Sequence, residues 1–284
     1  MTQPITPELK RWIIEQAGAG QSRKALYDSM VKAGWQATSA SKALVVVLGA
    51  DPALGAVEPE LPPPPANAVP EPDLSGEPAM LMAHDREVKI LAHMKNPRIV
   101  VFGGLLSSDE CGQVMASARE RLKRSETIDV KTGGSEINNV RTSDGMFFER
   151  KETELIDTIE KRIAALVNWP IENGEGMQIL RYGPGAQYEP HYDYFDPTQP
   201  GTPTIVKRGG QRVGTLIMYL QTPLRGGGTT FPDVPFECAP QAGNAVFFSY
   251  DRPDAATRTL HGGAPVLEGE KWIATKWLRE GVFV

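Results

Sequence analysis

The chain has 284 residues, of which 40% are hydrophobic and 23% are charged, and its formal net charge is −5 at pH 7. This composition is typical of a soluble globular protein, and the length fits one large β domain with a small additional domain. The mild negative charge gives no support for nucleic acid or an anionic membrane as a partner, because either would favour a basic face.

The two cysteines, Cys111 and Cys238, are too few for a disulfide framework and lack the CxxC spacing of a zinc site. The first residues, MTQPITPELKRW, lack the basic and apolar regions of a secretory signal. No stretch of the sequence approaches the roughly 18 apolar residues that a membrane span requires. We therefore expect reduced thiols and a cytoplasmic protein.

Residues 1–50 are expected to form a small helical domain of three short helices. The first helix begins after the N-cap Thr6, the second after Ser22, and the third at Thr38 or Ser39. Glycines follow each apolar repeat and end the helices. This domain has room for only a small core. The sequence leaves its role open between binding a partner, self-association and positioning of the substrate.

Residues 51–78 are rich in proline, with four consecutive prolines at 62–65. Proline lacks the backbone donor that the interior of a helix or sheet requires. This composition predicts a solvated, semi-rigid linker that is mainly polyproline II. A second domain is therefore expected from residue 79 to residue 284.

The second domain begins with a strand at 98–103 and a helix at about 108–122, for which Ser107 and Glu110 form a capping box. A second amphipathic helix covers about 155–166. Later strands are predicted at 177–182, 213–220, 244–250 and 272–278. Helices followed by many short strands favour a mainly β sandwich or jelly roll with supporting helices.

The triplet His191-Tyr192-Asp193 contains a possible pair of metal ligands. In an extended segment, residues i and i+2 point to the same side, so the imidazole and the carboxylate converge. His261, from a distant strand, would complete a face of two histidines and one carboxylate. Such a set binds Fe(II) on one side of an octahedron and leaves three positions open for other ligands.

A lysine, Lys271, follows His261 by ten residues. A turn between two strands would bring this lysine back beside the histidine on the wall of a barrel. A dicarboxylate that chelates iron at one end needs a cation at the other, and the Lys271 ammonium can supply it.

Several longer motifs accompany these residues, and together they resemble the catalytic domain of prolyl 4-hydroxylases, in the iron(II) and 2-oxoglutarate oxygenase superfamily. They are YxxGxxYxxHxDYF around the triplet, GGQRV with MYL, and GGxTxxP. A last motif is H-x9-K-W from His261 to Trp272, with a second KW five and six residues after Lys271. The segment from Arg141 to Gly145 (RTSDG) resembles the family's RTS segment. The resemblance covers about residues 98–280 and implies a double-stranded β-helix (jelly-roll) catalytic domain. The segment before His261 departs from the family's usual sequence.

The resemblance also implies roles for individual residues. The ligands of Fe(II) would be His191, Asp193 and His261. The residues that bind 2-oxoglutarate would be Lys271, Thr229 and Tyr182. The catalytic residue facing the substrate near the metal would be Tyr188. The residues that line the peptide groove would be Arg141, Ser143, Arg212 and Trp277.

The implied reaction is hydroxylation of prolyl residues in a peptide or protein, with O2 consumed, succinate and CO2 released, and ascorbate as reductant. One alternative is an oxygenase of the same fold that acts on a free amino acid, another small molecule or a nucleic-acid base. An open channel would favour a peptide, a closed pocket a small molecule, and a basic trench nucleic acid. The other alternative is a non-catalytic adaptor, against which the complete set of ligands argues.

Overall fold

The computed structural model describes residues 5–35, 37–48, 68–125, 127–128, 135–136 and 141–284. The chain divides into two compact units, Met1–Pro63 and Pro64–Val284, and each has its own hydrophobic core. Within these described ranges, no helix is both long enough and apolar enough to cross a membrane.

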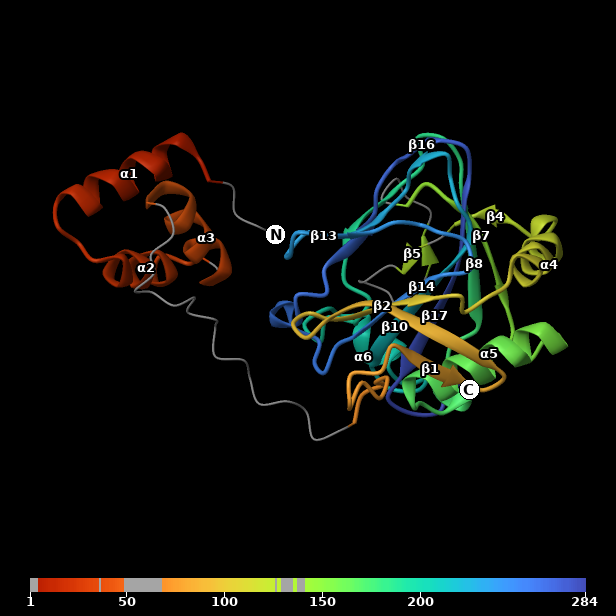
Figure 1. The fold of residues 1–284 in the computed structure, drawn as a ribbon. Coiled ribbons are helices and arrows are strands. Elements are labelled where there is room, and N and C mark those ends of the chain that lie inside the picture. Colours follow the sequence, from red (N-terminus) through yellow and green to blue (C-terminus); the bar gives the residue numbers. More distant parts are fainter. Residues whose placement is uncertain (1–4, 36, 49–67, 126, 129–134, 137–140) are drawn as a thin grey trace. The chain divides into compact units, whose positions relative to one another are not determined.

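The N-terminal unit contains three described helices, α1 (Pro7–Gly18), α2 (Arg23–Lys32) and α3 (Ala37–Leu48) (Figure 1). The predicted N-caps are confirmed: the side chain of Thr6 accepts a hydrogen bond from the N–H of Leu9, and Ser22 accepts one from Ala25. Helix α3 begins one residue earlier than predicted. The buried core is small, as expected, and consists of Ile13, Leu26, Met30, Ala40, Ala43 and Leu44.

The predicted linker is too long at its C-terminal end. Its four consecutive prolines lie outside the described residues, but residues 68–78 belong to the second unit. Pro70 and Pro72 are buried there, and the N–H of Glu71 donates to the carbonyl oxygen of Val167 at 2.7 Å. Proline has no backbone N–H, so it can be buried without losing a hydrogen bond. A proline-rich composition therefore fits this docked segment as well as it fits a solvated spacer.

The second unit is a double-stranded β-helix, which confirms the predicted jelly roll. In its described residues, a nine-stranded sheet has the order β1-β2-β3-β14-β10-β17-β8-β7-β4, and a four-stranded sheet has the order β13-β12-β15-β9. All the pairings within these two sheets are antiparallel. Two smaller sheets pair β11 with β16 and β5 with β6.

The strands of the large sheet are β1 (Met80–Ala83), β2 (Arg86–Met94), β3 (Arg98–Gly103), β4 (Lys123–Arg124), β7 (Asp144–Phe148), β8 (Met177–Tyr182), β10 (Arg212–Gln221), β14 (Ala245–Ser249) and β17 (Lys271–Arg279). Those of the four-stranded sheet are β9 (Tyr188–His191), β12 (Thr229–Phe231), β13 (Phe236–Cys238) and β15 (His261–Gly263). The remaining strands are β5 (Thr127–Ile128), β6 (Ser135–Glu136), β11 (Arg225–Gly226) and β16 (Val266–Glu268). The described α-helices of this unit are α4 (Ser108–Arg119), α5 (Glu154–Val167) and the short α6 (Thr202–Ile205), and two 3-10 helices cover Ile171–Asn173 and Ala255–Thr257.

The long central strands β10 and β17 are buried on both faces, and their side chains alternate between two cores. Leu216 and Met218 pack in the core shared with helices α4 and α5. Ile217 and Tyr219 pack in the core on the other face, which includes Phe231 of the four-stranded sheet. The sheet therefore places the side chains at 215, 217 and 219 between the two sheets, away from the helices.

The long predicted elements match the structure within a few residues. Strands β3 and β8 have the predicted bounds, and the capping box of Ser107 and Glu110 is present at the start of α4. The strands that the sequence did not predict, including β9, β12 and β15, are two to five residues long, except for the nine-residue β2. Such short segments carry too little periodicity to be predicted, and strand partners distant in the sequence hold them in place.

A buried ion pair joins helix α5 to the large sheet. The Nζ of Lys276 on β17 lies 2.5 Å from Oε1 of Glu160 on α5, and both residues are at most 2% exposed. The second carboxylate oxygen of Glu160 accepts from the N–H of Lys151 at 3.0 Å. Removing one partner of such a pair would leave a charge in a low-dielectric region.

We expect Lys276→Met to lower the free energy of unfolding by about 3–5 kcal/mol, because Glu160 loses its counter-ion. The double variant Lys276→Met/Glu160→Gln should recover most of this loss, since the glutamine is uncharged and can still accept from Lys151. Equilibrium unfolding in urea measures both. A single variant as stable as the unmodified chain would contradict the assigned role of the pair.

Candidate active site

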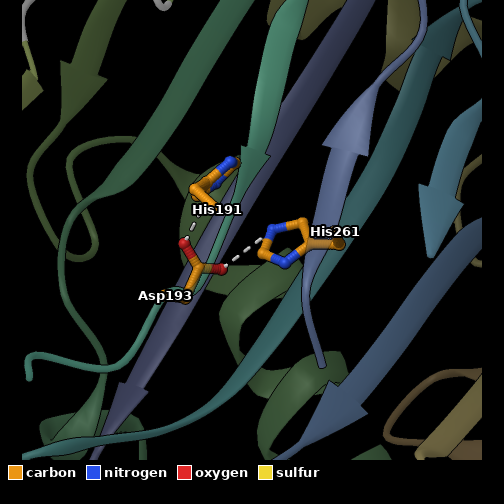
Figure 2. Close-up of side chains that lie close together, drawn as sticks. All are labelled: His191, Asp193 and His261. Carbon is orange, nitrogen blue, oxygen red and sulfur yellow. Dashed lines mark ion pairs between the residues drawn. The ribbon is translucent and has the colours of Figure 1, made fainter. Parts of the chain in front are cut away.

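Three side chains that are distant in the sequence meet between the two sheets (Figure 2). His191 ends β9, His261 begins β15, and the antiparallel pairing of these strands places the two histidines opposite each other. Asp193 lies in the bend after β9. Its Oδ1 is 3.6 Å from Nε2 of His191, and its Oδ2 is 3.4 Å from Nε2 of His261.

The hydrogen bonds of the two imidazoles direct the Nε2 atoms toward the carboxylate. Nδ1 of His191 lies 2.8 Å from the carbonyl oxygen of Glu189, and Nδ1 of His261 lies 3.0 Å from that of Thr259. A carbonyl oxygen only accepts, so in each neutral ring Nδ1 carries the proton and Nε2 presents its lone pair.

The charge state of the cluster suits a divalent cation. Burial lowers the pKa of His261 to about 4, so this imidazole is neutral at pH 7. Burial opposes ionisation of Asp193, but the neighbouring His261, His191 and Arg212 hold its pKa well below the ordinary value of an aspartate. One carboxylate and two imidazoles, with ligand atoms all within 4.8 Å of one another, fit Fe(II) bound on one face.

The same pocket contains a buried lysine. Lys271 at the start of β17 is 2% exposed, and burial lowers its pKa to about 8. Its Nζ lies 5.4 Å from the ring centroid of Tyr182 and 5.9 Å from that of Tyr219. Within the part of the chain that the structure describes, no carboxylate lies at ion-pair distance from this ammonium, so the site favours an anionic ligand.

A hydroxyl group near Lys271 is available to the same ligand. The hydroxyl of Tyr219 donates to Oγ1 of Thr229 at 2.8 Å. Because Thr229 accepts this bond, its own hydrogen remains for a ligand oxygen in the pocket, which Thr229 lines. Sequence reasoning did not identify Tyr219 as a site residue, although it lies in the MYL motif.

All the predicted site residues except Ser143 and Arg212 line this one pocket. Tyr188 stacks on the ring of His191 with centroids 3.7 Å apart, and the guanidinium carbon of Arg141 lies 5.2 Å from the centroid of the Tyr188 ring. Trp277 is 7% exposed, and in the described structure its indole Nε1 has no hydrogen-bond partner. An indole N–H in a pocket wall can donate to a bound substrate.

The other two predicted residues do not line this pocket, and Arg212 lies directly behind the pocket residues Asp193 and Trp277. Ser143 is fully buried, and its hydroxyl lies 3.0 Å from Oγ of Ser125. Arg212 is also buried, and its guanidinium makes two hydrogen bonds, of 2.6 and 2.9 Å, with the carboxylate of Glu175. The sequence showed two polar residues beside a motif, but burial and an internal partner depend on tertiary packing.

Arg212 instead supports the ligand segment. Its Nη1 donates to the carbonyl oxygen of Asp193 at 3.4 Å, and its guanidinium carbon lies 3.9 Å from the ring centroid of Trp277. Glu175 also accepts from Arg279 at 2.6 Å, so this buried carboxylate joins two arginines. Glu175 was not identified from the sequence.

Comparisons with known proteins agree with this geometry. Residues 177–279 match the model of the 2OG-Fe(II) oxygenase superfamily. The chain is 45% identical over 202 residues to prolyl 4-hydroxylase 1 of Arabidopsis thaliana, which covers 65% of this chain and 70% of that protein. It is 41% identical over 203 residues to prolyl 4-hydroxylase 5 of the same plant, covering 64% and 68%.

Among solved structures, the chain is similar to a viral collagen prolyl hydroxylase from Paramecium bursaria Chlorella virus-1, with 31% identity and a TM-score of 0.49 over 64% of this chain and 95% of that one. The family assignment rests on the two plant relatives, because their identity extends over more than two thirds of their length. The chain therefore belongs to the prolyl 4-hydroxylase family, within the 2OG-Fe(II) oxygenase superfamily.

Proposed function

We propose that this protein hydroxylates prolyl residues of a peptide or protein, with Fe(II) as cofactor and 2-oxoglutarate and O2 as co-substrates. The observation that carries this proposal is the joint placement in one pocket of the His191, Asp193 and His261 face and the buried ammonium of Lys271. A dicarboxylate can then chelate the metal and extend its second carboxylate to the lysine.

Strand β17 forms one wall of the pocket and determines which residues lie at each end of it. Its residues Lys271, Ile273, Thr275 and Trp277 alternate along one face and all line the pocket. Six residues of extended strand cover about 20 Å, so the lysine and the tryptophan occupy opposite ends of this wall. The 2-oxoglutarate would bind at the Lys271 end, and the peptide would bind at the end that Trp277 lines.

The protein's own residues hold and isolate the reactants. Lys271 and Thr229 would bind the distal carboxylate, while the apolar side chains of Leu180, Ile217 and Ile273 exclude water from the pocket between the polar groups. When bound, Fe(II), 2-oxoglutarate and O2 supply the oxidising chemistry, by which a proline C–H hydrogen is replaced by hydroxyl while succinate and CO2 are released. Ascorbate is proposed as the accessory reductant, on the family resemblance.

We expect His191→Ala and Asp193→Ala to abolish both Fe(II) binding and succinate formation, because each removes one of three converging ligands. Tyr192→Phe, between them, is the matched control and should retain both, since Tyr192 does not line the pocket. Metal content after dialysis and succinate release measure the two effects. An alanine variant that still forms succinate would refute the ligand assignment.

The affinity for 2-oxoglutarate should fall as the pH rises through about 8. The dianion binds the charged form of Lys271, whose pKa of about 8 in the free protein means that the ammonium is lost above this pH. From about pH 7 to about pH 9, the dissociation constant should rise about tenfold. Calorimetric titration without O2, in the presence of saturating Mn(II), measures it.

Lys271→Arg is the control for this titration, because a guanidinium stays charged over the whole range. Its pH profile should be flat even where its affinity is lower. An equally steep profile in this variant would assign the pH dependence to another group.

The substrate class is tested with proline-containing peptides incubated with the enzyme, Fe(II), 2-oxoglutarate and O2. Fragmentation mass spectrometry should find one added oxygen atom on proline, and peptides with alanine at that position should remain unmodified. Addition of oxygen to a different residue, or turnover of a free amino acid alone, would favour the small-molecule alternative.

A further inference from the structure

Backbone pairing does not fix the position of Asp193. Strand β9 ends at His191, and Asp193 lies two residues beyond it in a bend. The segment contacts the large sheet through β10, where Arg212 donates to the Asp193 carbonyl oxygen. The orientation of the carboxylate, which is 6% exposed and lines the pocket, must therefore come from the side chains around it.

Two hydroxyl groups supply that orientation. Oγ1 of Thr215 donates to Oδ2 of Asp193 at 2.7 Å, and the hydroxyl oxygen of Tyr250 lies 3.0 Å from the same Oγ1. Thr215 is completely buried, and Tyr250 is 2% exposed. Neither residue was identified from the sequence, and neither lies among the residues that line the pocket.

The direction of these hydrogen bonds follows from the charge of Asp193. An ionised carboxylate only accepts, so the single proton of the Thr215 hydroxyl is used toward Asp193. The remaining lone pairs of Thr215 can only accept, so Tyr250 must donate to it. The result is a one-way chain from Tyr250 through Thr215 to Oδ2 of Asp193, and donation from Tyr250 strengthens the second bond.

We call this chain of hydrogen bonds, from Tyr250 through Thr215 to Asp193, the hydroxyl relay. Both of its hydroxyl residues contact the large sheet. Thr215 lies in the middle of β10, which pairs with β14 on one side and β17 on the other. Tyr250 follows β14, and its N–H donates to the carbonyl oxygen of Val213 at 3.1 Å. Thr215 thus lies within the sheet and Tyr250 is hydrogen-bonded to its backbone, whereas the Asp193 carboxylate belongs to a bend.

We propose that Thr215 and Tyr250 are positioning residues that fix Oδ2 of Asp193 and leave Oδ1 as the oxygen that binds the metal. This inference rests on the proposed function, because it assumes that Asp193 is a ligand. The relay raises metal affinity by holding the carboxylate in its binding orientation before the metal arrives. It also limits Asp193 to one coordinating oxygen, which keeps the other coordination positions open.

The test is a titration of the full chain with Mn(II), followed by electron paramagnetic resonance without 2-oxoglutarate or peptide. Thr215→Val keeps the shape of the side chain but removes the donor, and should weaken Mn(II) binding about 10–100-fold. Thr215→Ser keeps the donor and should bind nearly as the unmodified chain does. Tyr250→Phe removes only the outer hydroxyl and should cause a smaller, measurable loss.

The visible absorption spectrum of bound Co(II) distinguishes a change in the orientation of Asp193 from a general loss of stability. With Co(II) bound at saturation, the visible absorption bands of Thr215→Val should shift, because both oxygens of Asp193 become free to coordinate. Thr215→Ser should restore the original spectrum. A matched control is Thr222→Val, which removes a threonine hydroxyl that accepts from the N–H of Ala242 at 2.8 Å and should change neither binding nor spectrum.

The outcomes distinguish this inference from the proposed function. Mn(II) binding that survives His191→Ala unchanged would overturn the metal site itself. Loss of binding in His191→Ala together with full binding in Thr215→Val would overturn only the relay. If Thr215→Val does not fold, Tyr250→Phe decides the matter, and affinity equal to that of the unmodified chain would refute the relay.

Discussion

The alternation of side chains along the paired strands β10 and β17 is the constraint on which the rest of this structure depends. One face of the pair packs against helices α4 and α5. The other face carries Thr215, Lys271 and Trp277 toward the four-stranded sheet, where His191 and His261 lie on neighbouring strands. A shift of either strand by one residue would send every one of its pocket side chains into the helical core.

Several charged side chains are buried around this pocket, and all but one have a partner among the described residues. Glu175 is held between Arg212 and Arg279, and the Asp193 carboxylate accepts a hydrogen bond from Thr215 and lies beside the two imidazoles. Lys271 alone among these five lacks a protein counter-ion in the described residues. A protein tolerates a buried charge when it is paired, so this lysine marks the place where a ligand completes the structure.

Most of the long elements, with the exception of the nine-residue β2, were predictable because local chemistry determines them. The capping box at Ser107 and the apolar repeat of α5 act within a few residues, and the central strands are continuous apolar runs. The docked segment around Pro70 and the short strands β9 and β15 were not predictable. These segments are held by contacts with parts of the chain that are distant in the sequence. A local sequence pattern carries no information about those contacts.

The motifs around His191, Asp193, His261 and Lys271, through their resemblance to the family, predicted the metal face and its anionic co-substrate. What holds these groups in place depends on tertiary packing. Thr215 and Tyr250 are 35 residues apart, and Arg212 is joined to a carboxylate at 175, so neither link has a signature in the sequence. Metal-binding residues occur in recognisable motifs because metal binding requires particular side chains. The side chains that support them depend on which strands pack beside them in the fold.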